Sequence, residues 1–505
     1  MLFNTPEFIF LFLPVAVVLH FALARFNVEA AILGTTIASL VFYAWWSPLF
    51  VLLPITSILI NFWLARRMVK VGEGIALRLL IAGIIINVVV LCYYKYTDFL
   101  LSIIFDRKFA PPNVPLALSF TTFVQIAFLV HVHKRRTVPD FSRYALFVVF
   151  FPHLIAGPIV RWNSLGRQIS DPSRYRVDWD NIALGLTIFV LGLAKKVLIA
   201  DSLSPHVAMV FDSAAIGEPI TSVAGWGGAV AFILQIFFDF SGYSDMAVGL
   251  GLLFNLRLPV NFAAPLRAVN MFDLWRRWHI TLSRLARDLV YVPLSLHHPT
   301  ALRRSISLFV TMVLIGIWHG AGWTFVAWGA FNGALLLINQ AWNFVRGPGG
   351  RSATGHLIGW AMTFTAFVAG GVLFRAADIE TAWRMLSAMV GLGGAMVPDH
   401  LAVDWDLRLI NHGYISLSFI LTWFGATWTL TGTMWTVMAL AIALLVPDTM
   451  EIVNYREGDA QSNWRRSTGV LAWRPSPMTL GLTVVLFGVV FAMIGRVSEF
   501  LYYQF

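Results

Sequence analysis

The sequence has 505 residues, of which 58% are hydrophobic and only 12% are charged. Soluble domains carry about 25% charged residues, so this composition leaves too little polar surface for a water-soluble protein. It also excludes a disulfide scaffold, since the single cysteine, Cys92, lies in an apolar run. Basic cytoplasmic loops facing anionic lipid explain the net charge of +10, and we expect no nucleic-acid binding. The composition predicts an all-α, polytopic membrane protein.

Continuous apolar runs predict the membrane helices, because about 20 apolar residues cross about 30 Å of hydrocarbon. The runs do not alternate with polar residues, so a β-barrel is not expected. We expect about 11–14 membrane helices, some of them short enough to be re-entrant. The predicted spans are Phe8–Leu23, Ala30–Trp46, Leu49–Ala65, Leu77–Tyr93, Leu116–Val132, Ala145–Ile159, Ile182–Ala200, Val223–Phe240, Ser305–Gly322, Phe325–Trp342, Leu357–Phe374, the long stretch Ile415–Val446, and Met478–Ile494.

Loop charges predict an orientation in the membrane. The segment Asn255–Arg304 holds eight arginines against two aspartates, so we expect it in the cytoplasm. The loop Asn343–His356 is basic without an acid and is predicted on the same side. Between Arg375 and His412 acids outnumber arginines, which predicts the outer face. Three crossings between Arg304 and Arg375 reconcile these assignments.

The first polar cluster in a predicted span is FFDFSGYSDMAVG, residues Phe237–Gly249. Asp239 and Tyr243 are four residues apart and share a helix face, and Asp245 follows. Acids in a membrane helix need partners, and we expect nearby arginines to supply them. We interpret these acids as structural more than catalytic, with Asp239 and Tyr243 kept as weak candidates for donor binding.

The second cluster is LWRRWHITLSRLARDL, residues Leu274–Leu289. If it forms one helix, Trp278 joins an apolar face and His279 lies at its border. The arginines lie on the opposite face: Arg276, Arg277, Arg284 and Arg287. Two interpretations remain open. The arginines contact lipid phosphates on an interfacial helix, or they line the entrance of a site for a phosphorylated donor.

The third cluster is IWHGAGWTFVAWGAFNG, residues Ile317–Gly333. His319 lies about 20 Å along its predicted helix, between Trp318 and a glycine-rich turn. An imidazole in apolar surroundings stays neutral and can accept a proton, which indicates a catalytic base. It can equally bridge closely packed helices through a carbonyl. The residues alone leave the two interpretations even.

Other chemistry finds little support in the sequence. There is no Walker A sequence, no HExxH motif and no Cys/His metal spacing, so we expect no metal and no bound cofactor. Two DWD sequences, at Asp178/Asp180 and Asp404/Asp406, are weak matches to the metal sites of glycosyltransferases.

The three clusters, in this order, resemble the membrane-bound O-acyltransferase family, and most closely its bacterial branch that acts in alginate O-acetylation. LPVNFAAPL, residues Leu258–Leu266, adds to this resemblance, as do FPHLIAGPIVR, GLAKKVLIAD and LFRAADIETAW. The resemblance covers residues 1–388, and residues 389–505 are expected to add further membrane helices to one domain. It departs from the family after YVPL, at Ser295–Pro299, and at Pro265–Leu266.

The resemblance implies a ring of helices around a thin centre, with a tunnel that reaches a catalytic histidine. On this basis His319 is catalytic and His279 is functionally important, while Arg276, Arg277, Trp278 and Trp318 are expected near the donor. The implied reaction moves an acyl group, expected to be acetyl, from a cytoplasmic thioester (acetyl-coenzyme A or a carrier-protein thioester) to an extracytoplasmic polysaccharide such as alginate.

The resemblance also implies a separate periplasmic acetyltransferase partner and a location in the bacterial inner membrane. The alternative function is a transporter or flippase for polysaccharide precursors, which would not consume thioester.

Overall fold

The computed structural model describes residues 1–505 except 106–113, 297–299, 348–351, 393–427, 456–472 and 495–505. Within the described ranges the secondary structure is helical and contains no β-strand, which confirms the predicted all-α class. By length and composition, six of the described helices can cross a membrane, and four shorter apolar helices accompany them. The chain is a multi-pass membrane protein.

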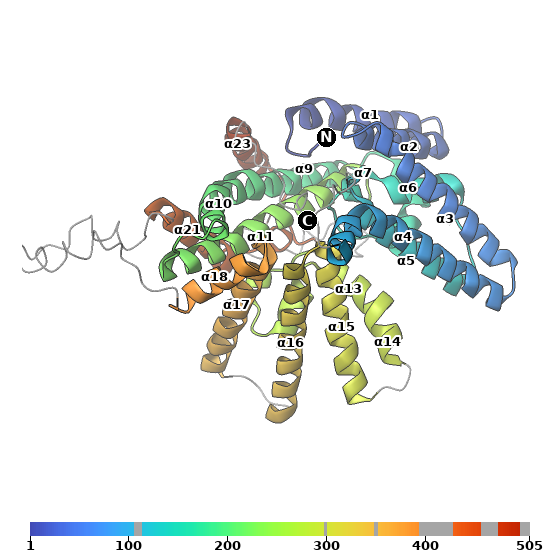
Figure 1. Cartoon of the computed structure of the whole chain (residues 1–505). Helices are drawn as coiled ribbons and strands as arrows, with labels where there is room; N and C mark the ends of the chain where they lie inside the picture. The colour runs from blue at the N-terminus through green and yellow to red at the C-terminus, as the bar shows by residue number, and fades with distance from the viewer. Residues whose placement is uncertain (106–113, 297–299, 348–351, 393–427, 456–472, 495–505) are drawn as a thin grey trace, which may run out of the picture.

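The N-terminal helices form one arm of the molecule (Figure 1). Asn27 begins the second of them by accepting a hydrogen bond from the Ala30 amide. The fourth continues well past the predicted end at Tyr93 and reaches Phe105. The elements are η1 (Phe8–Phe12), α1 (Leu13–Ala24), α2 (Val28–Ala44), α3 (Leu52–Lys70), α4 (Glu73–Phe105) and α5 (Leu118–Arg135).

The predicted span Ala145–Ile159 is wrong, because this segment forms two short helices followed by buried extended chain. α6 (Phe141–Val149) stops at Phe150, and α7 (Phe151–Leu154) begins with Pro152 in its first turn, where a proline is tolerated. Beyond α7 the buried Ile159 amide donates to the Thr281 hydroxyl at 3.0 Å. A non-helical backbone inside a membrane protein needs such partners. Further along, α8 covers Arg167–Ile169.

The centre of the protein is α11 (Ser222–Leu253), which is buried along most of its length. It packs against α9 (Trp179–Ala194), and α9 continues through the π-helical turn η5 (Lys195–Ala200) into α10 (Asp201–Ala215). A Cβ atom on Gly192 would lie 2.5 Å from the Gly242 carbonyl, and the same holds for Gly249 against Gly185. Small residues at these four positions let the two backbones approach closely.

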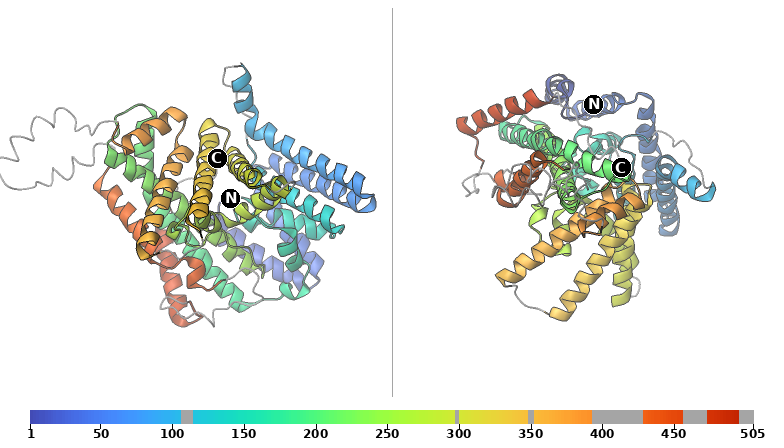
Figure 2. Two further views of the ribbon diagram at one scale, coloured as in Figure 1. Left: turned by 90° about the horizontal axis from the view of Figure 1, so that it is seen from below. Right: turned by 60° about the vertical axis from the view of Figure 1, so that its left-hand side comes forward.

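The chain then forms short helices before three long ones: α12 (Met271–Arg277), α13 (Ile280–Ala286), α14 (Val292–Leu296), α15 (Ala301–His319), α16 (Trp323–Arg346) and α17 (Ala353–Arg375). Figure 1 shows α14–α17 extending away from α1 and α2. α15 packs against α16, and α16 packs against α17. Seen from below, the blue N-terminal helices lie on one side of the yellow α15–α16 hairpin, and the orange to red helices lie on the other (Figure 2, left).

The last described helices are α18 (Ile379–Met389), α21 (Leu430–Leu445), α22 (Thr449–Ile452) and α23 (Pro477–Met493). The predicted stretch Ile415–Val446 is described only from residue 428 onward and contains α21. α23 returns to the start of the chain, where Phe491 contacts the Phe10 ring with centroids 5.2 Å apart. Asp404, Asp406 and most of the predicted outer segment up to His412 lie outside the described residues.

Candidate active site

His319 is the last residue of α15, at the inner end of the α15–α16 hairpin. The two helices meet closely, since a Cβ atom on Gly316 would lie 2.9 Å from the Gly329 Cα. Gly320 ends α15 in an extended conformation, and any side chain there would collide with the Phe325 ring. The glycines therefore fix the turn that carries the histidine.

Aromatic rings surround the His319 imidazole, which is 7% exposed. The ring centroids of Trp318, Trp328 and Phe374 lie 4.7, 5.2 and 5.0 Å from that of His319. The planes of the Trp328 and Phe374 rings are inclined by 86° and 75° to the plane of the imidazole. Three aromatic side chains thus pack directly against the imidazole.

His279 lies at a break between α12 and α13, where its backbone adopts a left-handed conformation with φ of 43°. The single helix predicted over Leu274–Leu289 is therefore wrong. The reason is Asn261, whose backbone carbonyl accepts from the Ile280 amide at 2.9 Å. Its side-chain oxygen also accepts from the Thr281 amide and hydroxyl at 3.3 and 2.8 Å. These bonds replace those that a continuous helix would make.

The same asparagine sets the chemistry of His279. Because a backbone N–H can only donate, the Asn261 atom bonded to the Thr281 amide is the oxygen. The Nδ1 atom of His279, 3.0 Å from that oxygen, then carries the proton and donates it. Nε2 is left as the basic nitrogen. Burial lowers the pKa of His279 to about 3, so the ring stays neutral at physiological pH.

The two histidines meet at a small cavity of about 30 Å³. Both line it, together with Trp278, Phe240 and Phe374 among others. The Trp318 ring is near both, with its centroid 6.5 Å from that of His279 and 4.7 Å from that of His319. The structure thus brings together four of the predicted site residues: His279, His319, Trp278 and Trp318.

His319 also lines a second cavity, of about 520 Å³. Trp318, Lys95 and Ser119 contribute to its wall, and Lys95 is the one Lys, Arg, Asp or Glu among the described residues that line it. Phe120 and Ile155 belong to the same wall. A volume of this size is typical of a small-molecule site.

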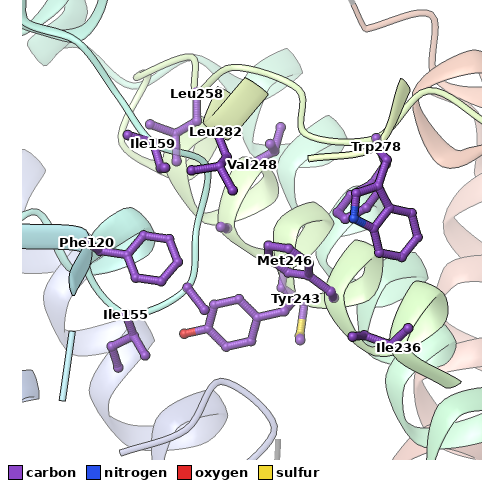
Figure 3. Packing of buried hydrophobic residues seen from close by; sticks show 14 of the residues in the cluster. Phe120, Ile155, Ile159, Ile236, Tyr243, Met246, Val248, Leu258, Trp278 and Leu282 are labelled. Carbon is purple, nitrogen blue, oxygen red and sulfur yellow. The ribbon is translucent and has the colours of Figure 1, made fainter. Parts of the chain in front are cut away.

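Tyr243 and Asp239 are absent from the described lining of both cavities. Figure 3 shows the Tyr243 hydroxyl directed toward Ile155. The Tyr243 ring stacks on Phe3 with centroids 4.7 Å apart. Asp239 instead forms an ion pair inside the helix bundle.

The partners of the acids in α11 are lysines and not the predicted arginines. Lys196 Nζ lies 2.9 Å from Asp239 and 2.7 Å from Asp201, and Lys195 Nζ lies 2.7 Å from Asp245. Both lysines come from the π-helical turn η5, which faces α11. The nearest charges in sequence were therefore not the nearest in space.

The arginines of α12 and α13 differ in exposure. Arg276 and Arg284 are exposed, and Arg277 is partly buried and donates to Asp273 at 2.8 Å. Asp288, at the start of the π-helical turn η7 (Arg287–Tyr291), accepts from Arg287 and from Arg161. Burial opposes the ionisation of Asp288, but these hydrogen bonds outweigh it and lower its pKa.

Two residues near the histidines were missed in the sequence. Asn261 lies in LPVNFAAPL, a motif without an ionisable group to mark it. Lys95 lies beyond the predicted end of its span, and its ammonium donates to the Trp318 and His319 carbonyls. The signal for Lys95 was a lone lysine between two tyrosines in a long apolar stretch.

Of the two weak acidic pairs, Asp178 serves as the N-cap of α9.

Comparison with known proteins places this architecture in a family. The model of the membrane-bound O-acyltransferase family matches residues 58–376. The chain is 38% identical over 428 residues to the peptidoglycan O-acetyltransferase of Helicobacter pylori, covering 78% of this chain and 80% of that protein. It is 35% identical over 429 residues to a probable alginate O-acetylase of Pseudomonas aeruginosa, covering 82% and 78%.

A more distant relative is the teichoic acid D-alanyltransferase of Streptococcus thermophilus, at 27% identity over 45% of this chain and 57% of that protein. The region that the family model matches includes both histidines, the small cavity that they share and the α15–α16 hairpin. The chain therefore belongs to the membrane-bound O-acyltransferase family and is an O-acyltransferase.

Proposed function

We propose that this protein transfers an acetyl group from a cytoplasmic thioester toward a glycan hydroxyl outside the inner membrane, with His319 as the general base. The observation that carries the proposal is the position of His319. It lines the small cavity shared with His279 and also the cavity of about 520 Å³. The His319 imidazole can thus contact groups in either cavity.

The reaction needs such a base because a hydroxyl is a poor nucleophile at neutral pH. His319 takes the hydroxyl proton as the oxygen attacks the thioester carbonyl carbon. The carbon–sulfur bond then breaks, and the proton passes to the leaving thiolate. The aromatic rings packed against His319 leave little space for water on that side of the imidazole, which would limit hydrolysis of the donor. His279, held by Asn261, fixes the opposite wall of the small cavity.

The charge distribution supports different entrances for the two substrates. The large cavity has a single described lysine and no described arginine in its wall, which suits a hydroxyl-bearing acceptor better than a polyphosphate. Arg276 and Arg284 are exposed on α12 and α13, where charge-assisted bonds to donor phosphates can form. Acetyl-coenzyme A and a carrier-protein thioester share this phosphate chemistry.

The names of the relatives support an acetyl group and a glycan acceptor. Those of Helicobacter pylori and Pseudomonas aeruginosa are named as O-acetylating enzymes for peptidoglycan and alginate. We infer that an extracytoplasmic polysaccharide is the final acceptor here as well. A separate periplasmic acetyltransferase is the inferred partner that completes the transfer.

The helix directions support the proposed orientation. α15, α16 and α17 run alternately, so the starts of α15 and α17 lie at one end and Arg375 lies at the other (Figure 1). Cysteines placed at the exposed Ala353 and Ala377, in a Cys92→Ser background, test this. An impermeant thiol reagent added outside should label Ala377→Cys alone; equal labelling of both would reverse or break the topology.

The catalytic assignment is tested with His319→Ala, purified and supplied with acetyl-coenzyme A. Turnover per folded molecule should fall by ~10²–10⁴-fold, the range expected for loss of a general base. The matched control is His20→Ala, because His20 is equally buried but bonds Thr35 in the N-terminal arm. Near-normal turnover in His319→Ala would falsify the assignment. A transporter would show no thioester consumption in either protein.

A further inference from the structure

The end of α15 that carries His319 is held by side chains of α4. Lys95 Nζ donates to the Trp318 carbonyl at 2.6 Å and to the His319 carbonyl at 2.9 Å. The hydroxyl of Tyr96, the next residue, donates to the Ile317 carbonyl at 2.8 Å. Three consecutive carbonyls at the end of one helix are thereby bonded by two consecutive residues of another.

These bonds answer a need that α15 cannot meet itself. The last carbonyls of any helix lack partners within it, and within a membrane an unsatisfied carbonyl costs several kcal/mol. Many helices close with a turn that brings amides back to these carbonyls. Here Gly320 is extended, with φ of −158° and ψ of 154°, and leads directly into the hairpin turn. Lys95 and Tyr96 supply the missing donors.

The Lys95 charge is directed at the helix end and not at an acid. Among the described ion pairs none includes Lys95, although its ammonium lies 5.8 Å from the centre of the Trp318 ring. A cation at the C-terminus of a helix is stabilised by the partial negative charge there. The lysine also lines the large cavity beside His319. It is thus positioned where it can fix the catalytic turn while bordering the substrate space.

We propose that Lys95 is a positioning residue, which with Tyr96 fixes the last turn of α15 and so holds the His319 imidazole between the two cavities. The proposal rests on the proposed role of His319. Loss of the two lysine bonds lets the Trp318 and His319 carbonyls turn toward other donors, and the imidazole moves with them. A displacement of about 1 Å in a catalytic group can cost ~10²-fold in rate.

The test compares Lys95→Met, which keeps an unbranched side chain but removes the donor, with Lys95→Arg, which can still donate to both carbonyls. Turnover per folded molecule should fall by ~10–10²-fold in Lys95→Met, with the Michaelis constants for acetyl-coenzyme A and acceptor nearly unchanged. Lys95→Arg should recover most of the turnover. A merely structural lysine predicts lower thermal stability at normal turnover. A lysine that binds an anionic substrate predicts a raised Michaelis constant. Either result overturns the proposal.

Tyr96→Phe tests the same feature with a variant that removes one hydroxyl only. Turnover should fall less than in Lys95→Met, since one carbonyl bond is lost instead of two. Its matched control is Tyr175→Phe, because the buried Tyr175 hydroxyl donates to the Ile169 carbonyl at 2.7 Å, away from the histidines. Equal turnover in the two tyrosine variants would count against positioning by Tyr96.

The double variant Lys95→Met/His319→Ala separates this inference from the proposed function. If the lysine acts through His319, the double variant is no slower than His319→Ala alone. A further loss in the double variant would mean that Lys95 acts independently, and would overturn only the positioning role. If His319→Ala itself keeps its turnover, the proposed function fails first and the positioning role fails with it.

Discussion

Two groups of ionisable side chains are buried in this membrane protein, and they are built in opposite ways. The ion-pair cluster joins Lys195 and Lys196 of η5 to Asp201, Asp239 and Asp245. The histidine pair, His279 and His319, instead lines a cavity among aromatic rings. In the first group each acid has a lysine within ion-pair distance, and Lys196 is shared by Asp201 and Asp239. In the second, two imidazoles line a cavity, and the proposed function uses one of them as a base. The two groups thus differ in what they face: opposite charges in the first, a cavity in the second.

The largest expected effect is a loss of stability when the ion-pair cluster is broken, without a loss of turnover. Lys196→Met leaves Asp201 and Asp239 without their buried cation, and breaking such a pair costs ~3–5 kcal/mol. Thermal unfolding of the purified protein should therefore shift strongly, while turnover per folded molecule stays near normal. The exposed Lys70→Met serves as the control and should change neither quantity. A loss of turnover as large as that of His319→Ala would erase the distinction.

A smaller effect is expected from Asn261→Ala, which sharpens the description of the histidine pair. This variant removes the acceptor that holds His279 Nδ1 and the Thr281 amide, so His279 can change tautomer and position. Turnover should fall by up to ~10²-fold with a modest change in the Michaelis constants. Asn61→Ala, which breaks a buried bond to Asn87 instead, should lower stability with normal turnover. If both variants behave alike, the asparagine beside His279 has only a packing role.

The arginines on α12 provide the next test, because they are ionisable groups that face solvent. Arg276→Gln should raise the Michaelis constant for acetyl-coenzyme A about tenfold, near the lower end of the ~1.5–3 kcal/mol of a charged hydrogen bond. Arg277→Gln should act less on the donor, since Arg277 already bonds Asp273. Both constants are measured by varying the donor at saturating acceptor. Unchanged donor affinity in Arg276→Gln would favour lipid phosphates as its partner.

The smallest effect concerns Asp288, a half-buried acid with two arginine partners. Because its pKa is lowered in the folded protein, it adds stability above its unfolded pKa of about 4 and loses that contribution as pH falls through the folded value. Solvent screening limits the contribution to ~0–1 kcal/mol. The difference in melting temperature between wild type and Asp288→Asn should shrink from pH 6 to pH 3. A difference that grows on acidification would have the wrong sign.

The apolar runs of the sequence were sufficient to predict most of the membrane helices, because a helix in lipid needs only length and hydrophobicity. The break at His279 was not predictable from local pattern, because it depends on Asn261, 18 residues earlier, which bonds the amides that follow. The break within Ala145–Ile159 had a local signal, since this apolar run contains Pro152 and the first helix stops before it, at Phe150.

Part of the candidate site could also be predicted from the sequence. His319 and His279 stand out as ionisable residues within apolar sequence. Lys95 did not stand out, because a lysine normally marks the end of a membrane span. In the structure α4 continues for ten residues beyond it. The partners of Asp239 and Asp245 were assigned to arginines close to them in sequence, while the packing of α9 against α11 brings lysines closer in space. Such pairings depend on which helices are neighbours, and the linear pattern does not contain that information.

The position of His319 in the walls of two cavities also bears on the electrical insulation of the membrane. An enzyme whose substrates enter from separate spaces would conduct ions if those spaces joined through water. Here the spaces meet at an imidazole packed among Trp318, Trp328 and Phe374, with room between the histidines for only about 30 Å³. An ion would have to shed its hydration to pass, at a cost of several kcal/mol or more. A neutral acetyl group has no charge to desolvate, so the proposed acyl transfer is compatible with a maintained membrane potential.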